Sequence, residues 1–265
     1  MSDSVFLSGV RPHIDAYLKA KGEEKRDYGD YWSASSAGYC MRKLIFERLG
    51  VPSVAEDDPR KTRVFESGHI FHSWLQDITK NAGVSIAQEL ELIDDKLMIK
   101  GHFDDLVLID GKLIVYDYKT QNSRAFHWQK KNGGEMSHYH KYQLATYMYM
   151  LRRDATMKNW NGEQGELEDF TDCTKVSEAR ILKLSKDDLS LTEEVLLWTP
   201  ALEKEVYSFW STLNGYWNAK KIPKCTCADR EGGFMAKPAY NPFYYKEEPC
   251  SIEWYQLWKD KQNAV

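Results

Sequence analysis

The chain has 265 residues, of which 42% are hydrophobic and 29% are charged, a composition that predicts a folded globular protein and excludes a disordered one. The formal net charge of −4 excludes a general electrostatic attraction to nucleic acid, although a local basic strip would still allow DNA binding. The sequence contains no run of about 18 apolar residues, so no membrane span is predicted. The first ten residues lack the features of a secretion signal. We therefore expect a cytoplasmic protein.

The N-terminal third of the chain is predicted to be helical. Ser33, Ser35 and Ser36 are the expected N-caps of the middle helix, and Gly50 is expected to end it. Prolines and acidic residues predict a loop over residues 51–61. The helices are expected over residues 14–21, 37–49 and 63–81.

Strands are expected to follow, because the hydrophobic period changes from that of a helix to the alternation of a strand. Asp110-Gly111 lies between two apolar runs and predicts a tight hairpin turn within a strand meander over residues 86–119. The elements expected after the meander are a helix over 135–152, strands over 179–184 and 193–198, and a helix over 200–219. This order predicts an α/β (α+β) fold with a central mixed sheet flanked by helices.

We expect a single domain over residues 1–265. It should comprise a helical N-terminal part over 1–83 and a catalytic core of sheet and helix over 84–200. The last part, over 201–265, should hold a helix and an irregular tail that contains most of the cysteines.

One group of charged residues stands out at the predicted hairpin. Asp104 precedes the turn, and the apolar run 113–116 leads directly into Asp117 and Lys119. Alternate side chains of a strand share a face, so we expect all three side chains to converge. Two carboxylates offer oxygen ligands to Mg²⁺ or Mn²⁺, and a nearby lysine can orient a water and offset charge. An exposed ion pair would give the same Asp-x-Lys pattern, but packing alone seldom ends a buried strand in this way.

These motifs resemble the RecB-like branch of the PD-(D/E)XK nuclease superfamily, which includes CRISPR-associated exonucleases. Phe103 stands where the superfamily name has a proline, a common departure in this branch. The segment 36–50 also resembles an N-terminal motif of such members. The matching motifs, in chain order, are Gly68 to His72, Gly101 to Asp104, Asp117 to Thr120, and Gln143 to Tyr147. The resemblance implies a restriction-endonuclease-like core with exonuclease activity.

The resemblance also implies roles for individual residues. His72, Asp104, Asp117 and the carbonyl of Tyr118 would bind the metal ion, with Lys119 as the catalytic lysine. A histidine ligand makes Mn²⁺ at least as suitable as Mg²⁺.

Gln143 and Tyr147 would contact the DNA backbone or support the site; they lie four apart and share a helix face. The alternative interpretations are a hydrogen-bonded core histidine for His72 and a core tyrosine for Tyr147. Glu89 would be an accessory ligand or, as we favour, an exposed strand residue.

The five cysteines are too few and too scattered to predict a disulfide framework. Cys40, Cys225, Cys227 and Cys250 divide into one N-terminal and three C-terminal residues, and in related nucleases such a division accompanies a 4Fe–4S cluster. The spacing departs from the usual pattern, since Cys225 and Cys227 are close and Cys250 lies much further on. Zinc bound to the same thiolates and reduced cysteines without metal are the alternatives. Cys173 has no assigned role.

The leading hypothesis is a Mg²⁺- or Mn²⁺-dependent DNA exonuclease that acts on single strands or duplex ends, in recombination, repair or phage DNA metabolism. A structure-specific endonuclease and a non-catalytic DNA-binding or assembly subunit are the alternatives. Binding should be independent of sequence because no base-reading module is evident. A helicase or recombination partner and a homo-oligomer are compatible with the sequence. The residues expected to contact DNA are Arg42, Lys43, Arg48, Lys119, Arg124, Lys130, Lys131 and Lys141, with Phe126 and Trp128 available for base stacking. A solvated charged loop is the alternative for these basic residues, and Lys130 and Lys131 fit it equally well.

Overall fold

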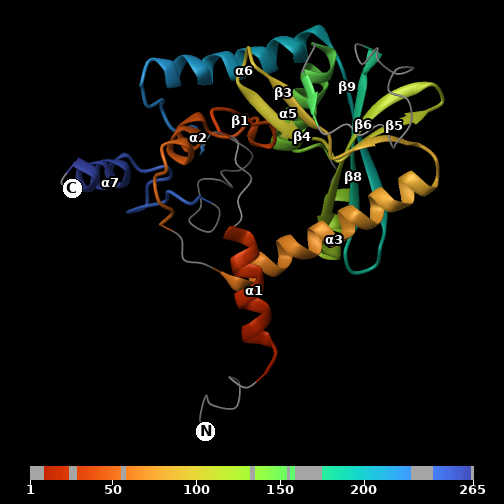
Figure 1. Ribbon diagram of the computed structural model, residues 1–265, viewed down its shortest axis with the longest axis horizontal. Helices are drawn as coiled ribbons and strands as arrows, with labels where there is room; N and C mark the ends of the chain where they lie inside the picture. The colour runs from red at the N-terminus through yellow and green to blue at the C-terminus, as the bar shows by residue number, and fades with distance from the viewer. Residues whose placement is uncertain are drawn as a thin grey trace.

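The computed structural model has its strands in two mixed sheets with helices around them (Figure 1). The predicted class, a mixed sheet flanked by helices, is confirmed. None of the helices in the described part of the chain is long and apolar enough to cross a lipid bilayer. The structure describes residues 9–23, 29–54, 58–131, 135–153, 156–158, 175–227 and 241–263.

The larger sheet has five strands, in the spatial order β2 (Ser85–Gln88), β5 (Asp105–Ile109), β6 (Lys112–Gln121), β8 (Glu178–Ser185) and β9 (Leu191–Leu197). β6 and β8 are parallel, and the other neighbours are antiparallel. The predicted hairpin joins β5 and β6. Asp110 and Gly111 both have positive φ, 50° and 74°, which matches the twist of the strands that they connect.

The smaller sheet has four strands, in the order β1 (Trp32–Ser33), β4 (Ile99–His102), β3 (Glu91–Asp94) and β7 (Thr156–Lys158). The predicted meander is therefore divided between two sheets. Glu89, with φ 51°, interrupts the expected meander between β2 and β3. Phe103 and Asp104 interrupt it again between β4 and β5. Asp104 was expected within a strand, but it lies at the joint between the two sheets.

Helices cover both faces of the larger sheet. Leu75 of α3 packs on Tyr116 and Tyr118 on one face, and the other face packs on α5, whose residues 143–151 are all buried. α3 and α6 lie on opposite sides of the strands in Figure 1. The helices are α1 (Arg11–Glu23), α2 (Met41–Arg48), α3 (Pro59–Asn81), α4 (Ser123–Lys131), α5 (His138–Arg152), α6 (Pro200–Asn218) and α7 (Ile252–Asn263).

Two predicted helix starts are wrong, and the reasons are local. α3 begins at Pro59 inside the expected loop, because Asp58 caps it by accepting a hydrogen bond from Arg60 N at 2.9 Å. The three serines do not cap α2; residues Ala34–Ser36 form a 3₁₀ turn, and Cys40 occupies the N-cap.

The helix α4 was not predicted from the sequence. Asn122 Oδ1 accepts a hydrogen bond from Ala125 N at 2.9 Å, a capping interaction at the start of this short helix.

Candidate active site

The β5–β6 hairpin brings two carboxylates together. Asp105 pairs with Tyr116, so the preceding residue, Asp104, lies next to Asp117 at the end of the ladder. The backbone N–H of Tyr118 donates a hydrogen bond to Asp104 Oδ2 at 2.5 Å. The carboxylate of Asp104 is thus held against the strand that carries Asp117.

Lys119 lies on the same face of β6 as Asp117, and its Nζ is 2.6 Å from Asp117 Oδ2. The side chain of Asp117 is 1% exposed, so water screens this ion pair little. Burial lowers the pKa of Lys119, but the charges of Asp117 and Asp104 raise it by more, and the net pKa is raised. The lysine is therefore a protonated cation beside two acidic groups.

His72 reaches the same place from α3, with its Nδ1 3.4 Å from Asp104 Oδ2. Gly68, one turn earlier, lies beside β6, where a Cβ would make an ordinary van der Waals contact with Thr120 Oγ1 at 3.7 Å. Burial, and then the positive charge of Lys119, lower the pKa of His72. The imidazole is neutral at pH 7 and offers a lone pair to a metal ion.

Gln143 supports the site from α5. Its Nε2 donates hydrogen bonds to Asp117 Oδ1 at 2.8 Å and to the Tyr147 hydroxyl at 3.3 Å. Gln143 and Tyr147 are 8% and 2% exposed, and they share a helix face as predicted. This contact orients the carboxylate of Asp117.

The electrostatics of the two carboxylates fit a divalent cation. Burial raises the pKa of Asp104, and the charge of Asp117 raises it further, against the opposing effect of Lys119. Asp117 Oδ2 is buried and makes no hydrogen bond of ordinary geometry with the described residues, although Lys119 Nζ lies close to it. Two adjacent carboxylates and a neutral imidazole are a suitable ligand set for Mg²⁺ or Mn²⁺.

A further carboxylate behind the site was missed by the sequence analysis. Asp105 is fully buried, and its donors come from α3, β2 and β6, the elements that surround the site. Asp105 therefore fixes these elements relative to one another. It accepts hydrogen bonds from Thr79 Oγ1 at 2.6 Å, Ser85 Oγ at 2.6 Å, Tyr118 Oη at 2.8 Å and Gln88 Nε2 at 3.3 Å.

Glu89 is exposed, as we favoured, but it lies between strands and not within one. Gln76 Nε2 connects it to the site by donating to Glu89 Oε1 at 3.2 Å and to the Asp104 carbonyl at 3.0 Å. After burial and the nearer charges, the charge of Glu89 also raises the pKa of Asp104. Glu89 thus lies within electrostatic reach of the carboxylates.

His140 is a second residue that the sequence analysis missed. Burial, and then the charge of Lys119, lower its pKa to about 4. Its Nδ1 is buried without a hydrogen-bond partner among the residues with described positions. The available signal was its position one turn before Gln143, on the same face of α5.

Arg42 is not brought to the carboxylates. Its Nε donates to the Pro223 carbonyl at 2.7 Å, and its Nη1 donates to the Cys250 carbonyl at 3.3 Å. These contacts connect α2 to the C-terminal segment. Three other basic residues expected at DNA also form ion pairs within the protein: Lys43 with Glu47, Arg48 with Asp30, and Lys141 with Glu205.

A hollow of about 590 Å³ lies beyond the end of β6, where Gln121, Arg124 and Trp128 are among the residues that line it. Trp128 is 67% exposed, whereas Phe126 is 2% exposed and packs inside. Of the two aromatic residues expected to stack on bases, Trp128 alone presents its ring to solvent.

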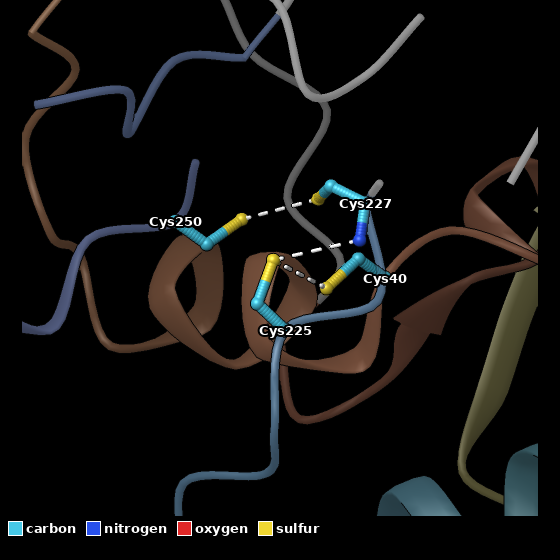
Figure 2. Close-up of side chains that lie close together, drawn as sticks. All are labelled: Cys40, Cys225, Cys227 and Cys250. Atoms are coloured by element: carbon cyan, nitrogen blue, oxygen red, sulfur yellow. Dashed lines mark hydrogen bonds between the residues drawn. The ribbon is translucent and has the colours of Figure 1, made fainter. Parts of the chain in front are cut away.

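The structure brings the four predicted cysteines together (Figure 2). Cys40 lies at the N-cap of α2, Cys225 and Cys227 follow α6, and Cys250 precedes α7. Their sulfur atoms all lie within 4.8 Å of one another, so the group could hold a metal ion. Cys173 lies outside the described residues.

A family model described as the PD-(D/E)XK nuclease superfamily matches residues 67–227. The match includes more than half of the chain, and the protein belongs to this superfamily. The matched residues contain His72, Asp104, Asp117, Lys119 and Gln143.

Solved structures resemble the chain more distantly. The crystal structure of SSO0001 is 14% identical, with a TM-score of 0.46 over 82% of this chain and 95% of its own. LHK-Exo in complex with dAMP is 18% identical, with a TM-score of 0.45 over 68% of this chain and 78% of its own. A second crystal structure of LHK-Exo, described as an alkaline exonuclease from Laribacter hongkongensis, is 16% identical, with a TM-score of 0.45 over 72% of this chain and 89% of its own. A comparison with curated proteins finds no match.

Proposed function

We propose that the protein is a Mg²⁺- or Mn²⁺-dependent DNA exonuclease of the RecB-like branch, acting on single-stranded DNA or duplex ends. The observation that carries this proposal is the meeting of His72, Asp104, Asp117 and Lys119 around β6, the central strand of the five-stranded sheet. Membership of a nuclease superfamily supports the hydrolytic chemistry. The whole chain would act as a single nuclease domain.

The metal ion would be held by the imidazole of His72, the carboxylates of Asp104 and Asp117, and the carbonyl of Tyr118. A bound divalent cation supplies Lewis acidity, which polarises a phosphodiester and makes water more acidic. Burial, and then the charge of Asp117, raise the pKa of Asp104, so this carboxyl holds its proton more tightly than usual, and a bound cation would favour its release.

Lys119 would act on the reacting atoms. Its ammonium group, held by Asp117, can donate hydrogen bonds to the scissile phosphate and to the attacking water, and it offsets the charge that develops in the transition state. Gln143 would hold Asp117 in the orientation that this contact needs.

The DNA strand would pass the hollow at the end of β6. Arg124 lines this hollow and can contact a phosphate, and the exposed ring of Trp128 can stack on a base. Both contacts tolerate any sequence, which supports binding without sequence preference.

The test is a degradation assay with end-labelled single- and double-stranded DNA, with Mn²⁺, with Mg²⁺ and with a chelator. We expect metal-dependent release of nucleotides and losses of about 100-fold or more in Asp117→Asn and Lys119→Ala. Lys112→Ala is a matched control, because this exposed lysine lies at the other end of β6. Wild-type rates in both site variants would refute the proposal.

A circular single-stranded substrate distinguishes the mode of cleavage. An exonuclease leaves the circle intact, whereas a structure-specific endonuclease opens it. Tight DNA binding without cleavage under any metal condition would instead indicate a non-catalytic subunit.

A further inference from the structure

The four-cysteine group, Cys40, Cys225, Cys227 and Cys250, is a set of metal-binding side chains separate from the carboxylate site. Cys40, Cys227 and Cys250 are buried, and Cys225 is partly buried. The Sγ atoms of Cys40 and Cys225 are 3.9 Å apart, and those of Cys227 and Cys250 are 3.5 Å apart. No disulfide joins them, because bonded sulfur atoms would be about 2.05 Å apart.

These distances discriminate between two kinds of metal centre. Four thiolates around one tetrahedral ion, with Zn–S bonds of about 2.3 Å, have sulfur atoms about 3.8 Å apart. In a 4Fe–4S cluster each thiolate binds a different iron atom, so the ligand sulfurs must lie further apart than around a single ion. The two observed sulfur–sulfur distances, 3.5 and 3.9 Å, lie on either side of the value of about 3.8 Å expected around a single ion. All four sulfur atoms lie within 4.8 Å of one another.

We propose that the four cysteines bind one tetrahedrally coordinated ion, zinc(II), and not the iron–sulfur cluster that the family resemblance implies. This inference goes beyond the proposed nuclease activity and does not depend on it.

The backbone of the Cys225-x-Cys227 segment is folded for one ion. In an extended strand these two side chains would share a face, but their backbone positions would be about 6.6 Å apart, at about 3.3 Å per residue. Here the backbone N–H of Cys227 donates to Cys225 Sγ at 3.5 Å, and the N–H of Thr226 donates to Cys40 Sγ at 3.4 Å. This backbone conformation directs both sulfur atoms into the same small space, which Figure 2 shows.

Further donors suit a negatively charged centre. Zinc(II) with four thiolates carries a net charge of about −2 and is stabilised by surrounding N–H groups. Asn241 Nδ2 lies 3.6 Å from Cys227 Sγ and 3.4 Å from Cys250 Sγ. Cys40, at the N-terminus of α2, also lies at the positive end of a helix dipole.

The ion would have a structural role. Four protein ligands leave no open coordination position, as in structural zinc sites and unlike catalytic ones. The ligands join α2 to the segments after α6 and before α7, and Arg42 reinforces this connection through the carbonyls of Pro223 and Cys250. Metal binding would therefore contribute directly to the stability of this region.

The decisive measurement is the metal content of full-length protein, purified without oxygen from cells supplied with iron and cysteine. We expect about one zinc ion per chain, little iron and no visible absorption band. Replacement by Co²⁺ should give the intense absorption in the red that tetrahedral thiolate sites produce. About four iron atoms per chain with a brown colour would overturn the proposal, and so would metal-free protein with four reactive thiols.

A variant assigns the metal to these residues. Cys227→Ser should lower zinc content and melting temperature, whereas Cys173→Ser, the matched change at the fifth cysteine, should keep full zinc. Loss of zinc only in Cys173→Ser would overturn the ligand assignment. If Cys227→Ser does not fold, the metal content of the wild-type protein still decides the question.

Discussion

Gln143 donates a hydrogen bond from Nε2 to Oδ1 of Asp117 at 2.8 Å, and both side chains are buried. This contact leaves Oδ2 of Asp117 turned toward Lys119. A glutamine on a core helix therefore determines which carboxylate oxygen faces Lys119.

Replacing Gln143 by leucine removes that constraint. We expect the rate of DNA hydrolysis to fall about 10- to 100-fold, because residues that orient ligands have effects of this size. Tyr147→Phe is the control, since it removes only the hydroxyl that accepts the second, longer hydrogen bond of Gln143. Single-turnover rates at saturating Mn²⁺ measure the effect, and equal losses in both variants would contradict this role for Gln143.

Asp105→Ala should destabilise the fold by about 3 kcal/mol, because several buried donors would lose a charged acceptor. Urea denaturation measures this change. Asp77→Ala, at an exposed position on α3, should change the free energy of unfolding by less than about 0.5 kcal/mol. A loss below 1 kcal/mol in Asp105→Ala would show that these contacts do not hold the elements together.

Two glycines should respond to alanine with opposite signs. A Cβ at Gly101 would lie 2.5 Å from Ala34 Cβ and 3.2 Å from Tyr147 Cε1, so Gly101→Ala should cost about 1–3 kcal/mol. Gly215 lies within α6, and apart from its own helix no described atom lies within 4 Å of such a Cβ, so Gly215→Ala should stabilise by about 0.5–1 kcal/mol. Thermal melts of both variants test the pair, and a stabilised Gly101→Ala would contradict the packing.

His140 should make the protein sensitive to acid. Its pKa is about 4 in the fold because of burial and then Lys119, below an unfolded value of 6.5. Folded protein therefore binds fewer protons between these values, and the stability present above pH 6.5 is lost as the pH falls toward 4. From pH 7.5 to pH 5 this histidine should account for a loss of about 2 kcal/mol. His140→Gln should lose correspondingly less in denaturation at the two pH values, and an unchanged difference would refute the assignment.

Trp128→Ala should weaken binding of single-stranded DNA about 10-fold while leaving kcat nearly unchanged, because stacking on one base contributes about 1–3 kcal/mol. Tyr207→Ala, an exposed aromatic residue on α6, should leave KM unchanged. A fall in kcat at constant KM in Trp128→Ala would place this tryptophan in the chemistry instead of in binding.

The sequence was informative where the determining interactions are local. Asp110-Gly111 predicted the hairpin, and the alternation of a strand placed Asp117 and Lys119 on one face. Positions one turn apart on a helix likewise predicted the shared face of Gln143 and Tyr147. Each of these inferences needs only the geometry of one element.

Interactions between distant segments could not be predicted in this way. The division of the strands into two sheets depends on which strands pair, and periodicity does not specify partners. In the sequence Asp105 is only the residue after Asp104. Its role depends on hydrogen-bond donors from three separate elements, which the sequence does not place together. Cys40 and Cys225 are separated by 185 positions, so their spacing carried no information about the distance between their sulfur atoms.

The position of Asp104 between two sheets has a mechanical consequence. Phe103 and Asp104 alone separate β4 from β5, and the buried ring of Phe103 fixes this crossing in the core. Asp117 belongs to one sheet only, so a small rotation of one sheet against the other would widen or narrow the gap between the carboxylates. Mg²⁺ binds oxygen at about 2.0–2.1 Å and Ca²⁺ at about 2.3–2.6 Å. Packing well away from the ligands would thereby help to determine which ion the protein selects.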